Sequence, residues 1–114
     1  MAISEAYSGS ASISTTEWSL TTNTSGPDVD TSDGVFQVFL DLAAMAAGDQ
    51  YQIRVYEKCR SASTQRVIYE AIITGTMAPT WVSPSLILMN GWDVTLKKLA
   101  GTDRTLEWSI RKVA

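Results

Sequence analysis

Apolar and polar side chains alternate along most of this chain with a period of two residues. This is the period of a β-strand that buries one face and exposes the other to water. In residues 50–59, for example, Tyr51, Ile53 and Val55 share one face. The pattern predicts strands at residues 3–8, 12–22, 35–42, 50–59, 66–74, 85–89, 92–99 and 105–113, and an edge or crossover segment at 80–83.

Turn signals separate these strands at short intervals. Asn90-Gly91 is typical of a tight turn, and residues 100–103 separate two long strands, which predicts a hairpin over residues 92–113. The alanines between Asp41 and Gly48 predict a single helical turn. We therefore expect an all-β fold, an antiparallel β-sandwich of the jelly-roll type. The pattern does not specify the order of the strands.

The N-terminal region differs in composition from the rest of the chain. Fourteen of the first 34 residues are Ser or Thr, and the segment from Asn23 to Gly34 reads as an acidic loop. Such strands either form an arm that adds a strand to a neighbouring subunit or make an ordinary edge hairpin. We expect one domain, with residues 1–34 as an extended arm or hairpin and loop, and residues 35–114 as the β-sandwich core.

Charge is distributed unevenly along the chain. The first 48 residues carry six acidic and no basic side chains, whereas the other 66 carry nine basic and six acidic ones. This split favours attraction between copies of the chain, either head to tail or arm to body. The net charge of −3 argues against a nucleic-acid partner, because phosphate binding requires a clustered basic surface.

Five of the basic side chains fall on the predicted terminal hairpin. They either form a solvated face or make a basic patch that meets an acidic surface of another subunit. On the second interpretation, the residues expected at a protein interface are Trp18, Glu17, Lys97, Lys98, Arg104, Arg111 and Lys112.

The residues that most catalytic and metal sites require are scarce. Histidine is absent, which excludes Ser-His-Asp and Cys-His catalysis and histidine metal ligation. Cys59 is the single cysteine, expected as a half-buried strand residue, and no phosphate-binding glycine motif is present. We therefore predict a protein that is not an enzyme, with no catalytic, cofactor-binding or metal-binding residues. Without a secretory signal or a membrane-spanning segment, we expect it to be soluble and made in the cytoplasm.

Two groups of residues leave alternatives open. Asp28, Asp30 and Asp33 could supply oxygen ligands to calcium, but their spacing matches a calcium-binding loop only in part, which favours an Asp-, Gly- and Pro-rich surface turn. The four tryptophans could form a platform that stacks on sugar rings. Trp18 and Trp108 are at inward positions, which favours core packing, whereas Trp81 and Trp92 lie at loop edges and are undecided.

Residues 51–58, 91–98 and 100–111 together resemble small structural proteins of tailed bacteriophages. The likeness covers about residues 35–113 and consists of strand patterns. The chain is similar to a group of proteins that includes head decoration, or cement, proteins, which bind over joints between capsid subunits. The resemblance implies a non-enzymatic virion protein on the capsid surface, with the major capsid protein and other copies of itself, as a dimer or trimer, for partners. The alternatives are a tail, head-closure or baseplate component, and a carbohydrate- or receptor-binding module.

Overall fold

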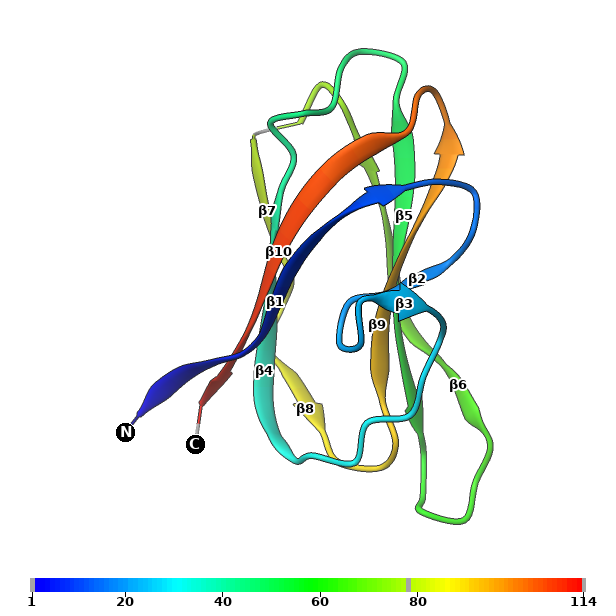
Figure 1. The fold of residues 1–114 in the computed structure, drawn as a ribbon. Coiled ribbons are helices and arrows are strands. Elements are labelled where there is room, and N and C mark those ends of the chain that lie inside the picture. The colour runs from blue at the N-terminus through cyan, green and yellow to red at the C-terminus, as the bar shows by residue number, and fades with distance from the viewer. Residues whose placement is uncertain (1, 78, 114) are drawn as a thin grey trace.

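The computed structural model describes residues 2–77 and 79–113, and it confirms the prediction of an all-β sandwich. The described residues form the strands β1 (Ile3–Ile13), β2 (Trp18–Ser19), β3 (Thr24–Ser25), β4 (Gly34–Asp41), β5 (Gln50–Lys58), β6 (Gln65–Thr74), β7 (Thr80–Val82), β8 (Leu86–Leu88), β9 (Asp93–Ala100) and β10 (Arg104–Val113). They build two antiparallel sheets that pack face to face (Figure 1). We call them sheet A, in the order β1-β10-β4-β7 with β8 also paired to β4, and sheet B, in the order β3-β2-β9-β5-β6.

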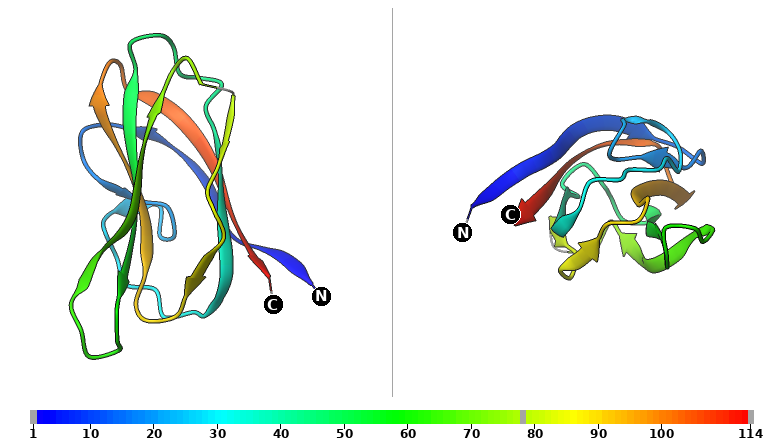
Figure 2. Two further views of the ribbon diagram at one scale, coloured as in Figure 1. Left: turned by 180° about the vertical axis from the view of Figure 1, so that it is seen from behind. Right: turned by 90° about the horizontal axis from the view of Figure 1, so that it is seen from below.

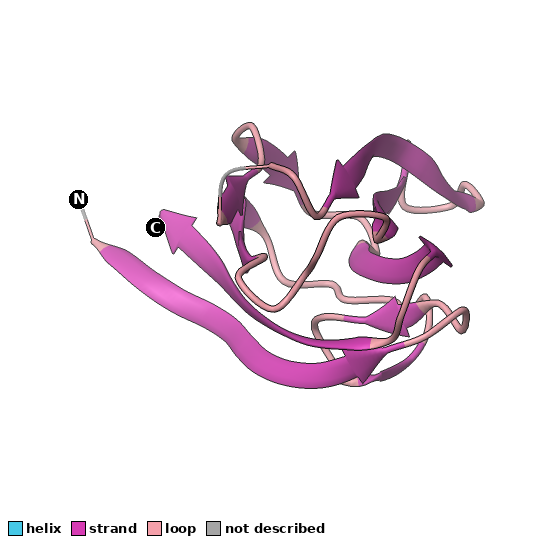
Figure 3. Ribbon diagram, turned by 90° about the horizontal axis from the view of Figure 1, so that it is seen from above, coloured by secondary structure: helices cyan, strands magenta, loops and turns pink. Residues whose placement is uncertain are grey.

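The pairing of the strands is that of a jelly roll. β1 pairs with β10, β2 with β9, β4 with β7 and β8, and β5 with β6. The first strand pairs with the last, and each following pair takes the next strand from either end, so that the chain forms one long hairpin folded into two layers. Figure 3 shows the two layers from above, with β1 and β10 curving around the same side.

The core lies between the inward faces of the two sheets. Phe36, Val38 and Leu40 alternate inward along β4, and Trp92 packs against Phe36 with ring centroids 4.5 Å apart. The alternation of the sequence is thus converted directly into a buried face. Other buried side chains include Ile13, Leu20, Tyr51, Ile53, Val55, Ile73, Val94, Leu96, Leu106, Trp108 and Ile110.

The predicted strand over residues 12–22 is wrong beyond its beginning. β1 ends at Ile13, and the chain then crosses from sheet A to sheet B, where only β2 and β3 are regular. The crossing brings Leu20 into the core, where its amide donates a hydrogen bond to the carbonyl of Val94 at 2.8 Å. The Ser/Thr-rich β1 pairs with β10 of the same chain from Ile3 to Ile13.

The predicted terminal hairpin over residues 92–113 is also wrong. β9 lies in sheet B between β2 and β5, whereas β10 lies in sheet A between β1 and β4. Both strands have an apolar face. When the strands lie in opposite sheets, these faces pack against each other and bury apolar surface, which pairing within one sheet would not achieve. The turn at residues 101–103 therefore connects the two layers.

Several other predictions can be compared with the structure. The strands at 35–42, 50–59, 66–74 and 85–89 are confirmed as β4, β5, β6 and β8, and the edge segment at 80–83 is confirmed as β7. The helical turn at residues 41–48 is wrong, because this segment forms a pair of non-helical turns before Asp49. None of the described segments is a helix long and apolar enough to span a membrane.

Candidate interaction surface

A row of apolar side chains crosses the outer face of sheet A. Ile3, Val113, Val35 and Ile87 stand directly opposite one another on β1, β10, β4 and β8. Residues that oppose each other on neighbouring strands project from the same face, and the residues next to them in sequence, such as Phe36, point into the core. Ile3 is 69% exposed and Ile87 is 79% exposed. We call these four residues the apolar row.

Shallow hollows lie along the apolar row. One, of about 170 Å³, is lined by Ile3, Val35 and Val113 together with Phe39 and Arg111. Another, of about 510 Å³, is lined by side chains around the opposite end of the row: Asp33, Gly34, Val35, Ile87, Leu88, Met89, Lys112 and Val113. An exposed apolar surface with this relief can accept the side chains of another protein.

Polar groups border the row on the same face. The guanidinium of Arg111 lies 3.8 Å from the ring centre of Phe39, and its Nε donates a hydrogen bond to Ser109 Oγ. The hydroxyl of Ser109 in turn donates to the carboxylate of Glu5 at 2.6 Å. Hydrogen bonds from Ser109 and Ser8 hold the pKa of Glu5 below its usual value, with a smaller contribution from the positive charge of Arg111. The apolar row therefore has a polar, ordered rim.

The other end of this face is acidic. Asp41 on β4 and Glu107 on β10 are exposed and stand directly opposite each other. Both line two hollows, of about 310 and 220 Å³. Asp41 lies six positions along β4 from Val35, which places this acidic end roughly 20 Å from the apolar row. None of the ion pairs between described residues includes Asp41 or Glu107.

The structure does not gather the predicted interface residues into one patch. Arg111 and Lys112 lie on β10 at the border of the apolar row. Lys97 and Lys98 lie on β9 in the other sheet, and Lys98 pairs with Asp103. The sequence suggested one basic hairpin because it could not show that β9 and β10 belong to different layers.

The remaining predicted interface residues take part in contacts within the chain. Arg104 donates from Nε to the carboxylate of Asp49 at 2.8 Å. Glu17 accepts hydrogen bonds from the hydroxyls of Tyr56 and Thr95, and Trp18 Nε1 donates to Asn23 Oδ1 at 2.8 Å. A role for these residues at a protein interface remains a prediction.

The apolar row was missed by the sequence analysis. Val35 and Ile87 are apolar residues in the outward phase of their strands, which is the signal that could have revealed them. Ile3 and Val113 lie at opposite ends of the chain, so only the pairing of β1 with β10 brings them together.

The acidic loop at residues 23–34 makes mainly internal contacts. Asp30 accepts hydrogen bonds from the amide and hydroxyl of Ser32 and from the hydroxyl of Tyr7. Asp28 accepts from the amide of Val29 at 2.8 Å. Within the described ranges, no three His, Cys, Asp or Glu side chains are placed to hold a metal ion.

The tryptophans are placed mainly by the core. Trp108 is buried as predicted, and Trp92 is completely buried, with Nε1 donating to the carbonyl of Ser32 at 2.8 Å. Trp18 and Trp81 are half-buried and pack against the core. The exposed aromatic row that a sugar platform requires is therefore not formed by these residues. The prediction that Cys59 is half-buried in a strand is wrong, because it is exposed just after β5.

Comparison with known proteins identifies the fold. No protein-family model and no curated protein matches this chain. Among solved structures, the fold is similar to PirA, with a TM-score of 0.52 and 9% identity over 93% of this chain and 92% of that one. It is similar to a chain of Bacillus endospore appendages, described as disulfide-linked pili, with a TM-score of 0.52 and 10% identity over 98% of this chain and 87% of that one. It is also similar to Cowpea mosaic virus top component, a naturally occurring empty particle, with a TM-score of 0.53 and 9% identity over 100% of this chain and 90% of that one. These likenesses establish a shared jelly-roll-like sandwich.

Proposed function

We propose that the protein is a non-enzymatic structural subunit that attaches to the outer surface of a large protein shell through the apolar row. The shell we propose is a bacteriophage capsid, which the protein decorates or cements by bridging neighbouring copies of the major capsid protein. The exposed apolar row on sheet A is the observation that carries this proposal.

The energetics of the apolar row suit repeated attachment to a shell. Complete burial of one isoleucine side chain contributes about 1.5–3 kcal/mol, so Ile3 and Ile87 alone can support a weak contact. On a symmetric shell such contacts recur many times, and bridging two subunits adds avidity. The Glu5 and Arg111 rim would then orient the subunit, as polar rims do at other protein interfaces.

Of the two alternative functions, the structure favours a tail, head-closure or baseplate component over a carbohydrate-binding module. A carbohydrate-binding module needs an exposed row of aromatic rings, which Trp81, Trp92 and Tyr56 do not supply. A tail, head-closure or baseplate component would use the same apolar surface, but in a ring of its own copies or with a tail protein. Assembly into rings in the absence of capsids would favour that alternative.

The test is co-sedimentation of the purified protein with capsids that lack it. We expect saturable binding at a fixed ratio per shell. The Ile87→Asp variant should bind about tenfold more weakly, because the contact loses apolar burial and must desolvate a charge. Ile87 is mostly exposed, so the substitution leaves the core intact. Deletion of residues 1–22 is a poor test, because it removes β1 from sheet A.

Leu99→Asp provides the matched control. Leu99 is an exposed apolar residue on β9, in the other sheet, and its substitution should leave capsid binding within about twofold. Failure of the intact protein to bind capsids would overturn the capsid proposal. Equal binding by the Ile87→Asp variant and the intact protein would exclude the apolar row as the attachment surface.

A further inference from the structure

The hairpin that joins β5 and β6 projects from the body of the sandwich and is basic. Figure 2 shows it extending beyond the other strands at one end of the molecule. It carries Lys58, Arg60 and Arg66, of which the two arginines are exposed. Glu57, which stands directly opposite Arg66, accepts a hydrogen bond from the amide of Met89 at 2.8 Å, and Gln65 donates to the carbonyl of Asp28 at 2.7 Å. No ion pair in the part of the chain that the structure describes includes any of these three bases.

The acidic end of sheet A has the opposite character. Like charges directly opposite each other on neighbouring strands destabilise a sheet, yet Asp41 and Glu107 occupy such a pair of positions. The nearest base on this face, Arg111, is held over the ring of Phe39. The hollows beside Asp41 and Glu107 leave room for side chains from outside the molecule.

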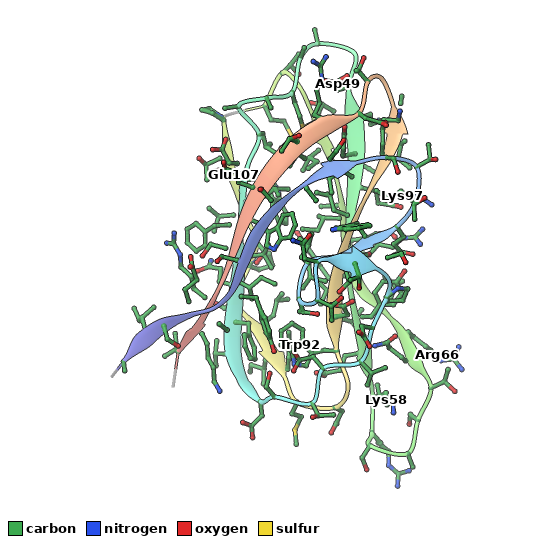
Figure 4. The ribbon with its side chains drawn as sticks, viewed as in Figure 1. Asp49, Lys58, Arg66, Trp92, Lys97 and Glu107 are labelled. Atoms are coloured by element: carbon green, nitrogen blue, oxygen red, sulfur yellow. The ribbon has the colours of Figure 1, made fainter. Side chains whose placement is uncertain are left out.

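These two charged surfaces lie too far apart to meet within one molecule. Figure 4 shows Glu107 on the outer side of sheet A, whereas Lys58 and Arg66 lie at the lower end of sheet B, diagonally opposite in this view. The molecule measures 40 × 32 × 20 Å along its principal axes, so a contact between the two surfaces requires a second copy.

We propose that the basic β5–β6 hairpin of one copy docks against Asp41 and Glu107 of the next, in a head-to-tail contact. The charges are complementary, and the two surfaces differ, so the contact is heterologous and leads to chains or rings rather than closed two-fold dimers. The acidic pair lies roughly 20 Å from the apolar row, and one of the hollows beside it extends to Glu5 and Arg111 at the rim of the row. This contact and the proposed attachment to a shell therefore rely on different residues of the same face.

Salt dependence is the first expected property of this contact. The interacting charges are on the surface, and the Debye length falls from about 10 Å at 0.1 M salt to about 3 Å at 1 M. Sedimentation of the purified protein should therefore show reversible, concentration-dependent association at about 0.05 M NaCl that weakens by at least about tenfold at about 0.5 M.

The decisive experiment uses one variant for each surface. The face variant carries Asp41→Asn and Glu107→Gln, which remove both charges without reversing them, and Asn keeps the acceptor for the amide of Ala43. The hairpin variant carries Arg60→Glu and Arg66→Glu. We expect each variant to be monomeric on its own. An equimolar mixture should form 1:1 dimers at low salt, because the intact hairpin of the face variant meets the intact face of the hairpin variant.

Lys97→Glu is the charge control, since it reverses one base on β9 outside both surfaces and should associate like the intact protein. Circular dichroism confirms that each variant is folded. The proposal is overturned if the intact protein is monomeric at low salt and high concentration, if either variant associates alone as the intact protein does, or if the mixture stays monomeric. None of these measurements involves a capsid, so their failure would leave the shell proposal standing.

Discussion

Asp49 links two loops at one end of the sandwich, and it does so as a charged group. Its carboxylate accepts hydrogen bonds from the amides of Thr102 and Ala46 and from Arg104 Nε, at 3.0, 2.9 and 2.8 Å. Gly101 passes so close that a side chain there would collide with Asp49, and its φ of 94° also favours glycine. This carboxylate thus ties the turn between β9 and β10 to the loop before β5.

The contacts of Asp49 predict a pH-dependent contribution to stability. The two amide hydrogen bonds lower its pKa from 3.8 to about 2, with Arg104 contributing less. Because the folded pKa is the lower one, the contribution is complete above pH 4 and is lost as pH falls through about 2. We expect Asp49→Asn to reduce the free energy of unfolding at pH 5 and the deficit to shrink toward pH 2, as measured by urea denaturation. A deficit of constant size from pH 5 to pH 2 would contradict this account.

At the scale of elements, β1 is a full member of sheet A. It pairs with β10 over its whole length and ends in Ile13, which is completely buried. The interpretation of the N-terminal residues as an arm or edge hairpin rested on their Ser and Thr content. Alternation in β1 places its serine side chains outward and Tyr7 and Ala11 toward the core. Figure 1 shows β1 and β10 side by side along this curved edge.

Deletion of residues 2–13 is therefore expected to damage the fold. The deletion would remove the hydrogen bonds that β10 makes with β1 and leave that edge of β10 unpaired. It would also remove the buried side chain of Ile13, and the loss of such a side chain lowers the free energy of unfolding by about 2–5 kcal/mol. Thermal denaturation followed by circular dichroism should show a large drop in the melting temperature or loss of the cooperative transition. An unchanged melting temperature would mean that β1 is a dispensable arm.

At the scale of the whole molecule, the tryptophans report on the closure of the sandwich. Trp92 and Trp108 are buried between the sheets, and Trp18 and Trp81 pack against the same core. We expect blue-shifted emission that acrylamide quenches weakly, followed by a red shift and strong quenching in denaturant. Strong quenching in the native state would instead indicate exposed indole rings and would revive the carbohydrate-binding alternative.

The two proposed contacts are compatible within one molecule. The apolar row is at the end of sheet A where β1 begins and β10 ends, and the acidic end lies along the same face. The base of the basic hairpin is joined to the segment after β8, because Met89 N donates to Glu57 and Lys58 N donates to the carbonyl of Asn90. A copy attached to a shell through the row would therefore hold the hairpin beside the Ile87 end of the row, with Arg60 and Arg66 exposed toward a neighbour. Head-to-tail contacts between neighbours would reinforce attachment without requiring a tighter individual site.

The sequence by itself determined the secondary structure of the middle of the chain and the all-β class. β4 and β5 follow from alternation alone, because a period of two places one face of each strand in the core whatever its neighbours are. β6 also forms where alternation predicts it, although Ile73 is its only buried residue. Composition was equally sufficient to exclude histidine-dependent chemistry. These conclusions depend on the local alternation of apolar and polar residues and on the amino-acid composition, neither of which requires the tertiary structure.

The tertiary structure decided which strands are neighbours, and with them both candidate surfaces. Ile3 and Val113 form one row, and Asp41 and Glu107 one acidic pair, only because β10 lies between β1 and β4. The same topology separates Lys97 from Arg111, which the sequence had placed on one hairpin. Alternation sets the face on which a side chain lies, but the pairing that buries the most apolar surface across two sheets sets what lies beside it.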